Sequence, residues 1–244
     1  MLLLFDLGNS RCKWARADGA LQPGAAIEYG QDFSRALETS LGALPRPERV
    51  LAVSVAGDAV TAQLAAWARA QFGLTLELMP ARSAQCGVSS RYDNPAQLGA
   101  DRWAALVGAR GRTRDAVCVV NCGTAVTIDA LDGAGVFQGG VILSGLATQR
   151  ASLLKNTHGI READGKDDSC LARNTADAVA AGTLQGLAGA IDRVVAEQAR
   201  VLGVTPHMLL AGGDAERLHP VLTTAHELAP LIVLEGLHRM ALEP

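Results

Sequence analysis

The sequence lacks an excess of charge of either sign. Its 244 residues include 22 Lys and Arg against 25 Asp and Glu, which leaves a formal net charge of -3 at pH 7 and an isoelectric point near 5.9. The one compact basic cluster, residues 110–114, is typical of a solvated connection after a helix. Binding to a polyanion needs a basic surface, so no nucleic-acid partner is expected.

Long apolar runs are also absent. Residues 1–5 are apolar, but no basic leader precedes them and they end directly in Asp6, so the run is too short for a signal peptide or a membrane span. We expect a buried first strand here and no membrane partner.

Cysteine is scarce, and its spacing forms no pairs. The five cysteines are an odd number without a paired C-x-x-C arrangement, which argues against a disulfide framework or a zinc site. Reduced thiols favour a cytoplasmic location, and Cys118 and Cys122 are most simply small core residues.

The sequence does contain enough hydrophobic residues, 49%, to bury a large core. An internal similarity indicates two α/β domains, because residues 6–9 and 121–124 each follow an apolar run, and each continues into a second strand that turns at an Asp-Gly pair. We therefore predict one domain at residues 1–115 and a second at residues 116–244, each beginning with a β-hairpin.

Hydrophobic periodicity and capping residues predict the remaining elements. In the first half these are a strand at 49–55, a helix at 58–73 capped by Asp58, a strand at 74–79, and a helix that starts at Asn94 and Pro95 and ends near Ala109. In the second half they are strands at 136–143 and 208–211, helices at 145–156 and from Asp214, and a long helix to about Leu202 capped by Asn174 or Thr175. Residues 162–170, rich in Asp and Lys, are predicted to form a mobile loop.

Two glycine turns carry a phosphate-binding pattern. A glycine between two strands lets backbone N–H groups approach phosphate oxygens, and both Gly8 and Gly123 occupy such a position. Asp6 stands at a strand end, where it can hold Mg²⁺ or its water shell. The side chains able to donate to phosphate are those of Asn9, Ser10 and Lys13. One such turn is as often an ordinary hairpin, but two in one chain favour phosphate binding.

Asp101 and Arg102 interrupt an otherwise apolar helical pattern. A carboxylate can accept the hydroxyl proton when a phosphoryl group is transferred to an alcohol, and an arginine can pair with a substrate carboxylate or phosphate. Helix spacing alone favours a simpler interpretation, in which the acid is exposed and the arginine stem covers Trp103.

Taken together, four motifs in family order resemble those of type III pantothenate kinases. They are Asp6-x-Gly8-Asn9 with Lys13; Tyr92-x-Asn94-Pro95-x-x-Leu98-Gly99-x-Asp101-Arg102-Trp103; Gly123-Thr124-Ala125 with Thr127 and Asp129; and Asn174-Thr175. The second motif is the specific one. The glycine turns occur throughout the wider superfamily of acetate kinases, sugar kinases, heat-shock chaperones and actin.

The resemblance implies an α/β fold of two ribonuclease-H-like (actin-like ATPase) domains with mixed β-sheets flanked by helices, and ATP held between them with Mg²⁺. It implies phosphorylation of pantothenate to 4'-phosphopantothenate, the first step of coenzyme A synthesis, with Asp101 as general base. ATP would be held by Asp6, Leu7, Gly8, Asn9, Ser10, Arg11, Cys12, Lys13 and Thr124. Pantothenate would be bound by Tyr92, Gly99, Ala100, Asp101 and Arg102, and by Thr175, which matches a contact that in this family lies at a homodimer interface.

Asn121 departs from the pattern that the resemblance implies. Family members commonly have Asp here, and that carboxylate helps hold a monovalent cation such as K⁺ or NH₄⁺. An amide oxygen can ligate K⁺ but brings no charge, so cation dependence is left open. Two other functions also stay open: a related kinase acting on acetate or a sugar, against which residues 92–102 argue, and an ATP-binding regulatory or accessory protein of the same fold without kinase turnover.

Overall fold

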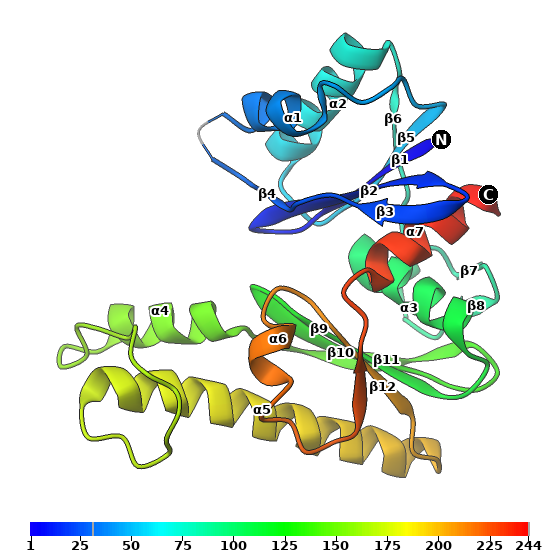
Figure 1. Cartoon of the computed structure of the whole chain (residues 1–244). Helices are drawn as coiled ribbons and strands as arrows, with labels where there is room; N and C mark the ends of the chain where they lie inside the picture. The colour runs from blue at the N-terminus through cyan, green and yellow to red at the C-terminus, as the bar shows by residue number, and fades with distance from the viewer. Residues whose placement is uncertain (31, 244) are drawn as a thin grey trace. The chain divides into compact units, whose positions relative to one another are not determined.

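The computed structural model describes residues 1–30 and 32–243, and these form two compact units (Figure 1). Unit 1 contains residues 1–114, 135–137 and 231–243, and unit 2 contains residues 115–134 and 138–230. Each unit has a mixed β-sheet flanked by helices, as expected for this α/β fold. Among the described residues, no helix combines the length and the apolar character that a membrane crossing requires.

The sheet of unit 1 is built on the first hairpin. Its strand order is β3-β2-β1-β5-β6, with β4 paired to β2. The hairpin strands β1 and β2 are antiparallel, whereas β1 pairs in parallel with β5, and β5 with β6. The bounds are β1 Leu2–Leu7, β2 Arg11–Asp18, β3 Ala20–Pro23, β4 Ile27–Glu28, β5 Arg49–Ser54 and β6 Leu76–Leu78. The predicted hairpin and the predicted strands near 49–55 and 74–79 are confirmed.

Successive side chains of β1 point to opposite faces of the sheet and therefore pack against different helices. Leu3, Phe5 and Leu7 pack into a core with α1 (Phe33–Leu41) and α2 (Asp58–Phe72), which cover one face of the sheet (Figure 1). Asp6 has the opposite parity and points to the other face. There, α3 (Ala100–Arg112) contacts β5, and α7 (Ile232–Leu242) contacts β1 and β5.

The predicted helix from Asn94 to Ala109 is wrong at its start. Asn94 caps only a 3-10 turn, η1 (Pro95–Gln97), by accepting a hydrogen bond from the Ala96 amide. Leu98 is extended, with ψ of 130°, and its buried side chain stops the turn from continuing. Gly99 then caps α3, so Asp101 lies in the first turn of this helix. The predicted cap of the earlier helix is also displaced by one residue, because Gly57 rather than Asp58 precedes α2.

The predicted domain boundary between residues 115 and 116 assigns the C-terminal helix α7 to the second domain. In the structure α7 belongs to unit 1. It packs on α3 through two glycines. A Cβ at Gly236 would overlap the Ala104 carbonyl, and a Cβ at Gly108 would overlap the Ile232 carbonyl. The two backbones therefore approach more closely than side chains would permit.

Two short strands in unit 1, β7 (Ala84–Gln85) and β8 (Val88–Ser90), form a hairpin. The start of β11 (Val136–Ser144) pairs with β8, which brings Phe137 opposite Ser90. Neither short strand was expected from the sequence pattern.

Unit 2 repeats the hairpin plan with a longer helix. Its strands lie in the order β13-β12-β9-β10-β11, with β9 and β10 antiparallel and β9, β12 and β13 parallel. The remaining bounds are β9 Val117–Cys122, β10 Ala125–Leu131, β12 His207–Ala211, β13 His226–Leu228, α4 Leu146–Asn156, α5 Thr175–Leu202 and α6 Ala215–Leu218. The apolar face of α5 covers the core formed by β9, β10 and β12, as its periodicity predicts.

Candidate active site

Asp6 is a buried carboxylate at the end of β1. It lies opposite Lys13 on β2 and is 8% exposed. Burial raises the pKa of Asp6 to about 7, because the charged form loses its hydration; the charge of Lys13 opposes this rise, and the charge of Asp101 adds to it. The structure thus brings Asp6 of β1 and Asp101 of α3 into electrostatic range of each other within unit 1.

The turn after Asp6 is tight and exposed. The Gly8 amide donates to the Arg11 carbonyl at 3.2 Å, and a Cβ at Gly8 would lie 3.3 Å from that oxygen. Asn9, Ser10 and Arg11 are exposed, so this turn lies at the surface. Leu7 and Cys12 are buried in the core of unit 1, which leaves only their backbone atoms for the predicted contact with ATP.

Asp101 is held in place by its own helix. Its Oδ1 atom accepts a hydrogen bond of 2.8 Å from the Arg102 amide in the first turn of α3. A Cβ at Gly99 would lie only 2.7 Å from Oδ1, so this position of the carboxylate requires glycine before the helix. Burial raises the pKa of Asp101, against the opposing effects of the Arg102 amide and the Arg102 charge.

Arg102 is nearly enclosed, with 5% of its surface exposed. Its guanidinium lies 5.8 Å from the centre of the Tyr92 ring and 5.9 Å from that of Phe137. The two rings are stacked at 5.9 Å. The sequence did not predict that Phe137 contacts Tyr92 and Arg102, because these residues are far from it in the chain and a strand pattern does not predict such contacts. The interpretation of Arg102 as a stem covering Trp103 gives way to this aromatic contact.

The second glycine turn lies at the end of β9 in unit 2. Gly123 donates to Ala125 at 3.0 Å, and the exposed Thr124 accepts from the Gly145 amide at 3.0 Å. A Cβ at Gly145 would overlap the Gly123 carbonyl, and a Cβ at Gly212 would overlap Cys122. Three turns therefore pack against one another through backbone atoms alone.

Thr175 is the first residue of α5, directly after the cap Asn174. The Asn174 side chain accepts a hydrogen bond of 2.9 Å from the Asp177 amide, as the predicted cap requires. Beside this helix start lies an open hollow of about 730 Å³ in unit 2, whose lining includes Leu153, Thr175 and Val179.

Comparison with known proteins places this geometry in a family. The family model described as type III pantothenate kinase matches residues 2–197. A relative of that name from Aromatoleum aromaticum is 41% identical over 245 residues, which cover 100% of this chain and 98% of the relative. The chain belongs to the type III pantothenate kinase family. A second type III pantothenate kinase, from Nitrosococcus oceani, is 38% identical and covers 99% of this chain and 94% of its own.

Solved structures support the fold of this type III pantothenate kinase family member. A Campylobacter jejuni protein assigned to the Baf family of transcriptional activators superimposes with a TM-score of 0.61 at 19% identity, covering 98% of this chain and 96% of its own. The activator of 2-hydroxyisocaproyl-CoA dehydratase from Clostridium difficile, solved with bound ADPNP, has a TM-score of 0.53 at 14% identity, covering 99% and 92%. At such identities the likeness shows the actin-like ATPase fold alone.

The described residues of this family member offer few side chains that could bind a metal ion. Among residues 1–30 and 32–243, no three His, Cys, Asp or Glu side chains converge as ligands. Asp6 is the one carboxylate at the first glycine turn, which fits a Mg²⁺ ion carried by ATP phosphates better than one held by protein alone. Asn121, where the family resemblance implies a cation-holding carboxylate, is half-buried near the end of β9.

Proposed function

We propose that the protein transfers the γ-phosphoryl group of ATP to pantothenate, giving 4'-phosphopantothenate for coenzyme A synthesis, with Asp101 as the general base. As a member of the type III pantothenate kinase family it is an ATP-dependent kinase. The observation that carries the assignment of Asp101 is its position: a carboxylate fixed by the Arg102 amide, next to a glycine that leaves room for it, and coupled electrostatically to Asp6.

In this reaction Asp101 accepts the proton of the primary hydroxyl of pantothenate. The hydroxyl oxygen forms a bond to the γ-phosphorus, the bond from that phosphorus to the bridging oxygen breaks, and ADP leaves with the bonding electrons. The raised pKa of Asp101 suits this role, because a more basic carboxylate takes the proton more readily.

The glycine turns and their neighbours hold ATP in this proposal. The side chains of Asn9, Ser10 and Lys13 in the first turn and Thr124 in the second turn contact phosphates, and Gly8 keeps the first turn free of a side chain. Asp6 would hold the water shell of a Mg²⁺ ion that arrives with ATP, and that ion would neutralise phosphate charge. The buried positions of Leu7 and Cys12 restrict them to backbone contacts.

The acceptor is held by the start of α3 and by Arg102. Arg102 pairs with the pantothenate carboxylate, and the Tyr92 and Phe137 rings beside the guanidinium help to hold it for that contact. Gly99 and Ala100 leave the backbone open to the substrate beside Asp101.

Three further features belong to the same proposal. The protein forms a homodimer in which Thr175 contacts pantothenate at the interface. Asn121 would be the residue to hold a K⁺ or NH₄⁺ ion, and its amide would bring no charge to that ion, so a smaller activation is expected than with Asp. The five cysteines are all free, which supports a cytoplasmic location.

The test is ADP release by purified protein with MgATP, with and without pantothenate and K⁺. We expect pantothenate-dependent turnover, and we expect Asp101→Asn to lower kcat by about 100-fold or more. The exposed neighbour Asp93 supplies the matched control, Asp93→Asn, which should keep the wild-type rate. ATP binding without any pantothenate-dependent turnover would overturn the kinase and favour an ATP-binding regulator.

A further inference from the structure

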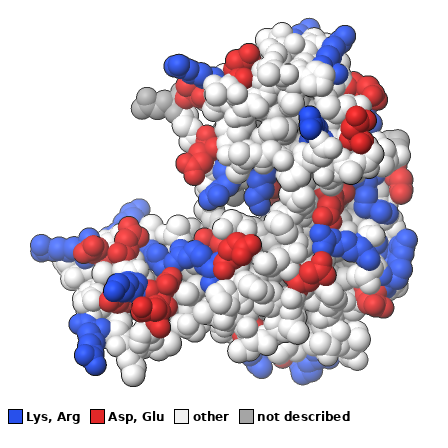
Figure 2. Space-filling view, in the orientation of Figure 1, with Lys and Arg blue, Asp and Glu red and all other residues white. Residues whose placement is uncertain are grey.

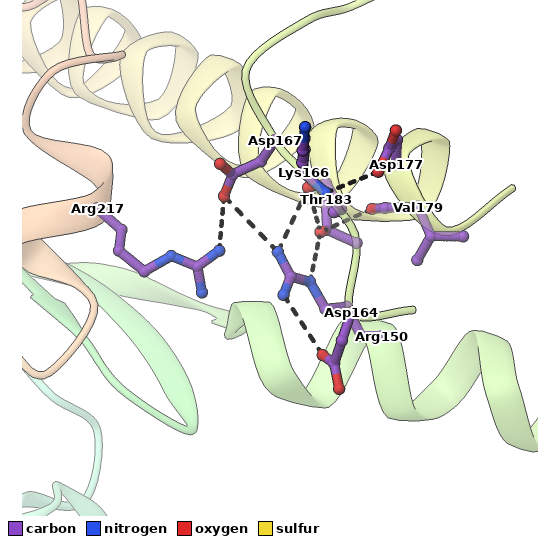
Figure 3. A network of polar contacts seen from close by, with 9 residues as sticks. Arg150, Asp164, Lys166, Asp167, Asp177, Val179, Thr183 and Arg217 are labelled. Atoms are coloured by element: carbon purple, nitrogen blue, oxygen red, sulfur yellow. Dashed lines mark hydrogen bonds and ion pairs between the residues drawn. The ribbon is translucent and has the colours of Figure 1, made fainter. Parts of the chain in front are cut away.

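Residues 164–167 of unit 2 cross the first turn of α5, the turn that carries Thr175 (Figure 3). A Cβ at Gly165 would overlap the backbone of Ala176 and Asp177, so the loop and the helix touch backbone to backbone. The next residue, Lys166, donates its amide to Asp177 Oδ1 at 2.7 Å. The loop therefore rests directly on the helix start.

Asp177 connects this loop to the helix cap through both of its carboxylate oxygens. Oδ1 accepts the Lys166 amide, and Oδ2 accepts from the Asn174 side-chain amide at 2.6 Å. The Asp177 backbone amide in turn donates to Asn174 Oδ1. Thr175 lies between these two partners in the chain, so its backbone is fixed from both sides.

A second anchor holds the loop from α6 and α4. Arg217 of α6 donates to Asp167 Oδ2 at 2.7 Å, and this hydrogen bond lowers the pKa of Asp167. Arg150 of α4 lies 4.0 Å from the same carboxylate oxygen and donates to the buried hydroxyl of Thr183 on α5 at 3.2 Å. The sequence predicts a mobile loop here, and these contacts indicate that its centre is tied down (Figure 3).

The contacts at the helix start contribute little to holding the whole fold together. Lys166, Asn174 and Asp177 form exposed hydrogen bonds, and exposed charged contacts add little to global stability. The body of α5 is held separately by its buried apolar face against the strands of unit 2. What the loop does control is the position of the first turn.

We propose that residues 164–167 and Asp177 form a clasp that positions Thr175 for the acceptor. Asp177 is a positioning residue that acts through Thr175 and does not touch the substrate. This inference rests on the proposed function, in which Thr175 contacts pantothenate. It adds a specificity determinant located in the loop between α4 and α5.

Asp177→Asn separates positioning from folding. The amide keeps the size of the side chain and one acceptor oxygen, but its NH₂ group must face either the Asn174 side-chain amide or the Lys166 backbone amide, so two donors meet where one hydrogen bond stood. We expect the pantothenate KM to rise about tenfold, while kcat and the ATP KM change by less than about twofold. Gly165→Ala, which forces the loop off the helix, should give the same pattern.

The control is Asp168→Asn, an exposed carboxylate on the same loop for which the described residues show no contact; it should leave all constants unchanged. Thr175→Ala should raise the pantothenate KM by itself. In the double variant Thr175→Ala with Asp177→Asn, the increase should not exceed that of Thr175→Ala alone, because both changes disrupt the same contact.

The outcomes separate this inference from the proposed function. Absence of pantothenate-dependent turnover in the wild type would overturn both. Wild-type turnover with a raised KM in Thr175→Ala, but unchanged KM in Asp177→Asn and Gly165→Ala, would overturn the clasp alone. Multiplicative KM effects in the double variant, or equal losses in kcat and both KM values, would also overturn it.

Discussion

Asp6 and Asp101 are two carboxylates kept on one face of a sheet by different means. Asp6 is carried there by strand alternation, and Asp101 by a helix that starts one residue after a required glycine. The negative charge of Asp101 makes ionisation of Asp6 less favourable, so it contributes to the raised pKa of Asp6. A site that concentrates negative charge before substrate arrives is suited to a ligand that brings Mg²⁺.

Removing the Asp6 charge should stabilise the protein at high pH. The folded-state pKa of about 7 exceeds the value of 3.8 for a free carboxyl, so the folded chain holds this proton more tightly than the unfolded chain. The resulting stability is complete below about pH 4 and is lost as the pH rises to 7.

Between pH 5 and pH 8, Asp6→Asn should therefore gain roughly 3 kcal/mol in free energy of unfolding relative to the wild type. Urea unfolding at both pH values measures this gain. Asp18→Asn, an exposed carboxylate on β2, is the control. A gain from Asp6→Asn that is the same at both pH values would contradict the buried-charge explanation.

Gly99 is predicted to be required for the position of the Asp101 carboxylate. Alanine would place a Cβ 2.7 Å from Oδ1, and the nearest other atom, of Val55, lies at a comfortable 3.6 Å. Gly99→Ala should therefore move Asp101 without unfolding unit 1, and kcat should fall about 100-fold. The kinetic assay and a thermal melt test this together, with Gly57→Ala, whose Cβ meets nothing, as the control. A wild-type kcat in Gly99→Ala would be evidence against the assigned role of Asp101.

Among the secondary-structure elements, the packed helices α3 and α7 support the candidate site. The helix that carries Asp101 and Arg102 is packed against α7 through Gly108 and Gly236. Because α3 contacts β5 and α7 contacts β1, the pair also fixes Asp101 relative to the strand of Asp6. The helix α7 thus supports the elements that carry the candidate acceptor site.

Enlarging Gly236 should destabilise unit 1. Its Cβ would overlap the Ala104 carbonyl, which is rigid backbone, so Gly236→Ala should cost about 3 kcal/mol in free energy of unfolding. Gly189→Ala on α5 is the matched control, because it lies in a helix with open space around it and should raise stability by up to about 1 kcal/mol. Equal effects of the two substitutions in a thermal or urea melt would refute the close packing.

At the scale of the whole molecule, the chain spans nearly the full length of the relatives it matches, and the family is shown over both units. The two hairpins with their glycine turns are related in plan, yet the units differ in what they carry. Unit 1 holds the two carboxylates and Arg102, and unit 2 holds Thr124, Asn121 and Thr175.

If Thr175 reaches the acceptor of the partner subunit, a variant without the base and a variant with weak pantothenate binding should complement each other. Asp101→Asn homodimers have no base, and Thr175→Ala homodimers bind pantothenate weakly. After subunit exchange, a mixed dimer contains one intact site, so turnover at low pantothenate should exceed that of either parent. The same sample should sediment as a dimer of 25.3 kDa chains. No recovery from mixed dimers would show that Thr175 acts within its own subunit or not at all.

Much of the fold and of the candidate site was predictable from local patterns. The two hairpins, the strand of residues 49–54 and the long helix capped by Asn174 are confirmed, because strand alternation, Asp-Gly turns and caps act within a few residues. The motif around Asp101 predicted the family, and Asp101 itself lies within electrostatic range of Asp6 in unit 1. The residue roles themselves stay predictions.

Other features depended on contacts between residues far apart in the chain. The helix of Asp101 starts after Gly99 rather than at Pro95, because burial of Leu98 outweighs the local helix signal. Phe137 lies beside Arg102, and α7 packs on unit 1 through close backbone contacts. Hydrophobic periodicity along the sequence predicts neither contact. Local patterns in the sequence therefore predicted the family and the two glycine turns, because such patterns act within a few residues. The positions of Asp101, Arg102 and Thr175 could not be predicted in this way, since packing between residues far apart in the chain sets them.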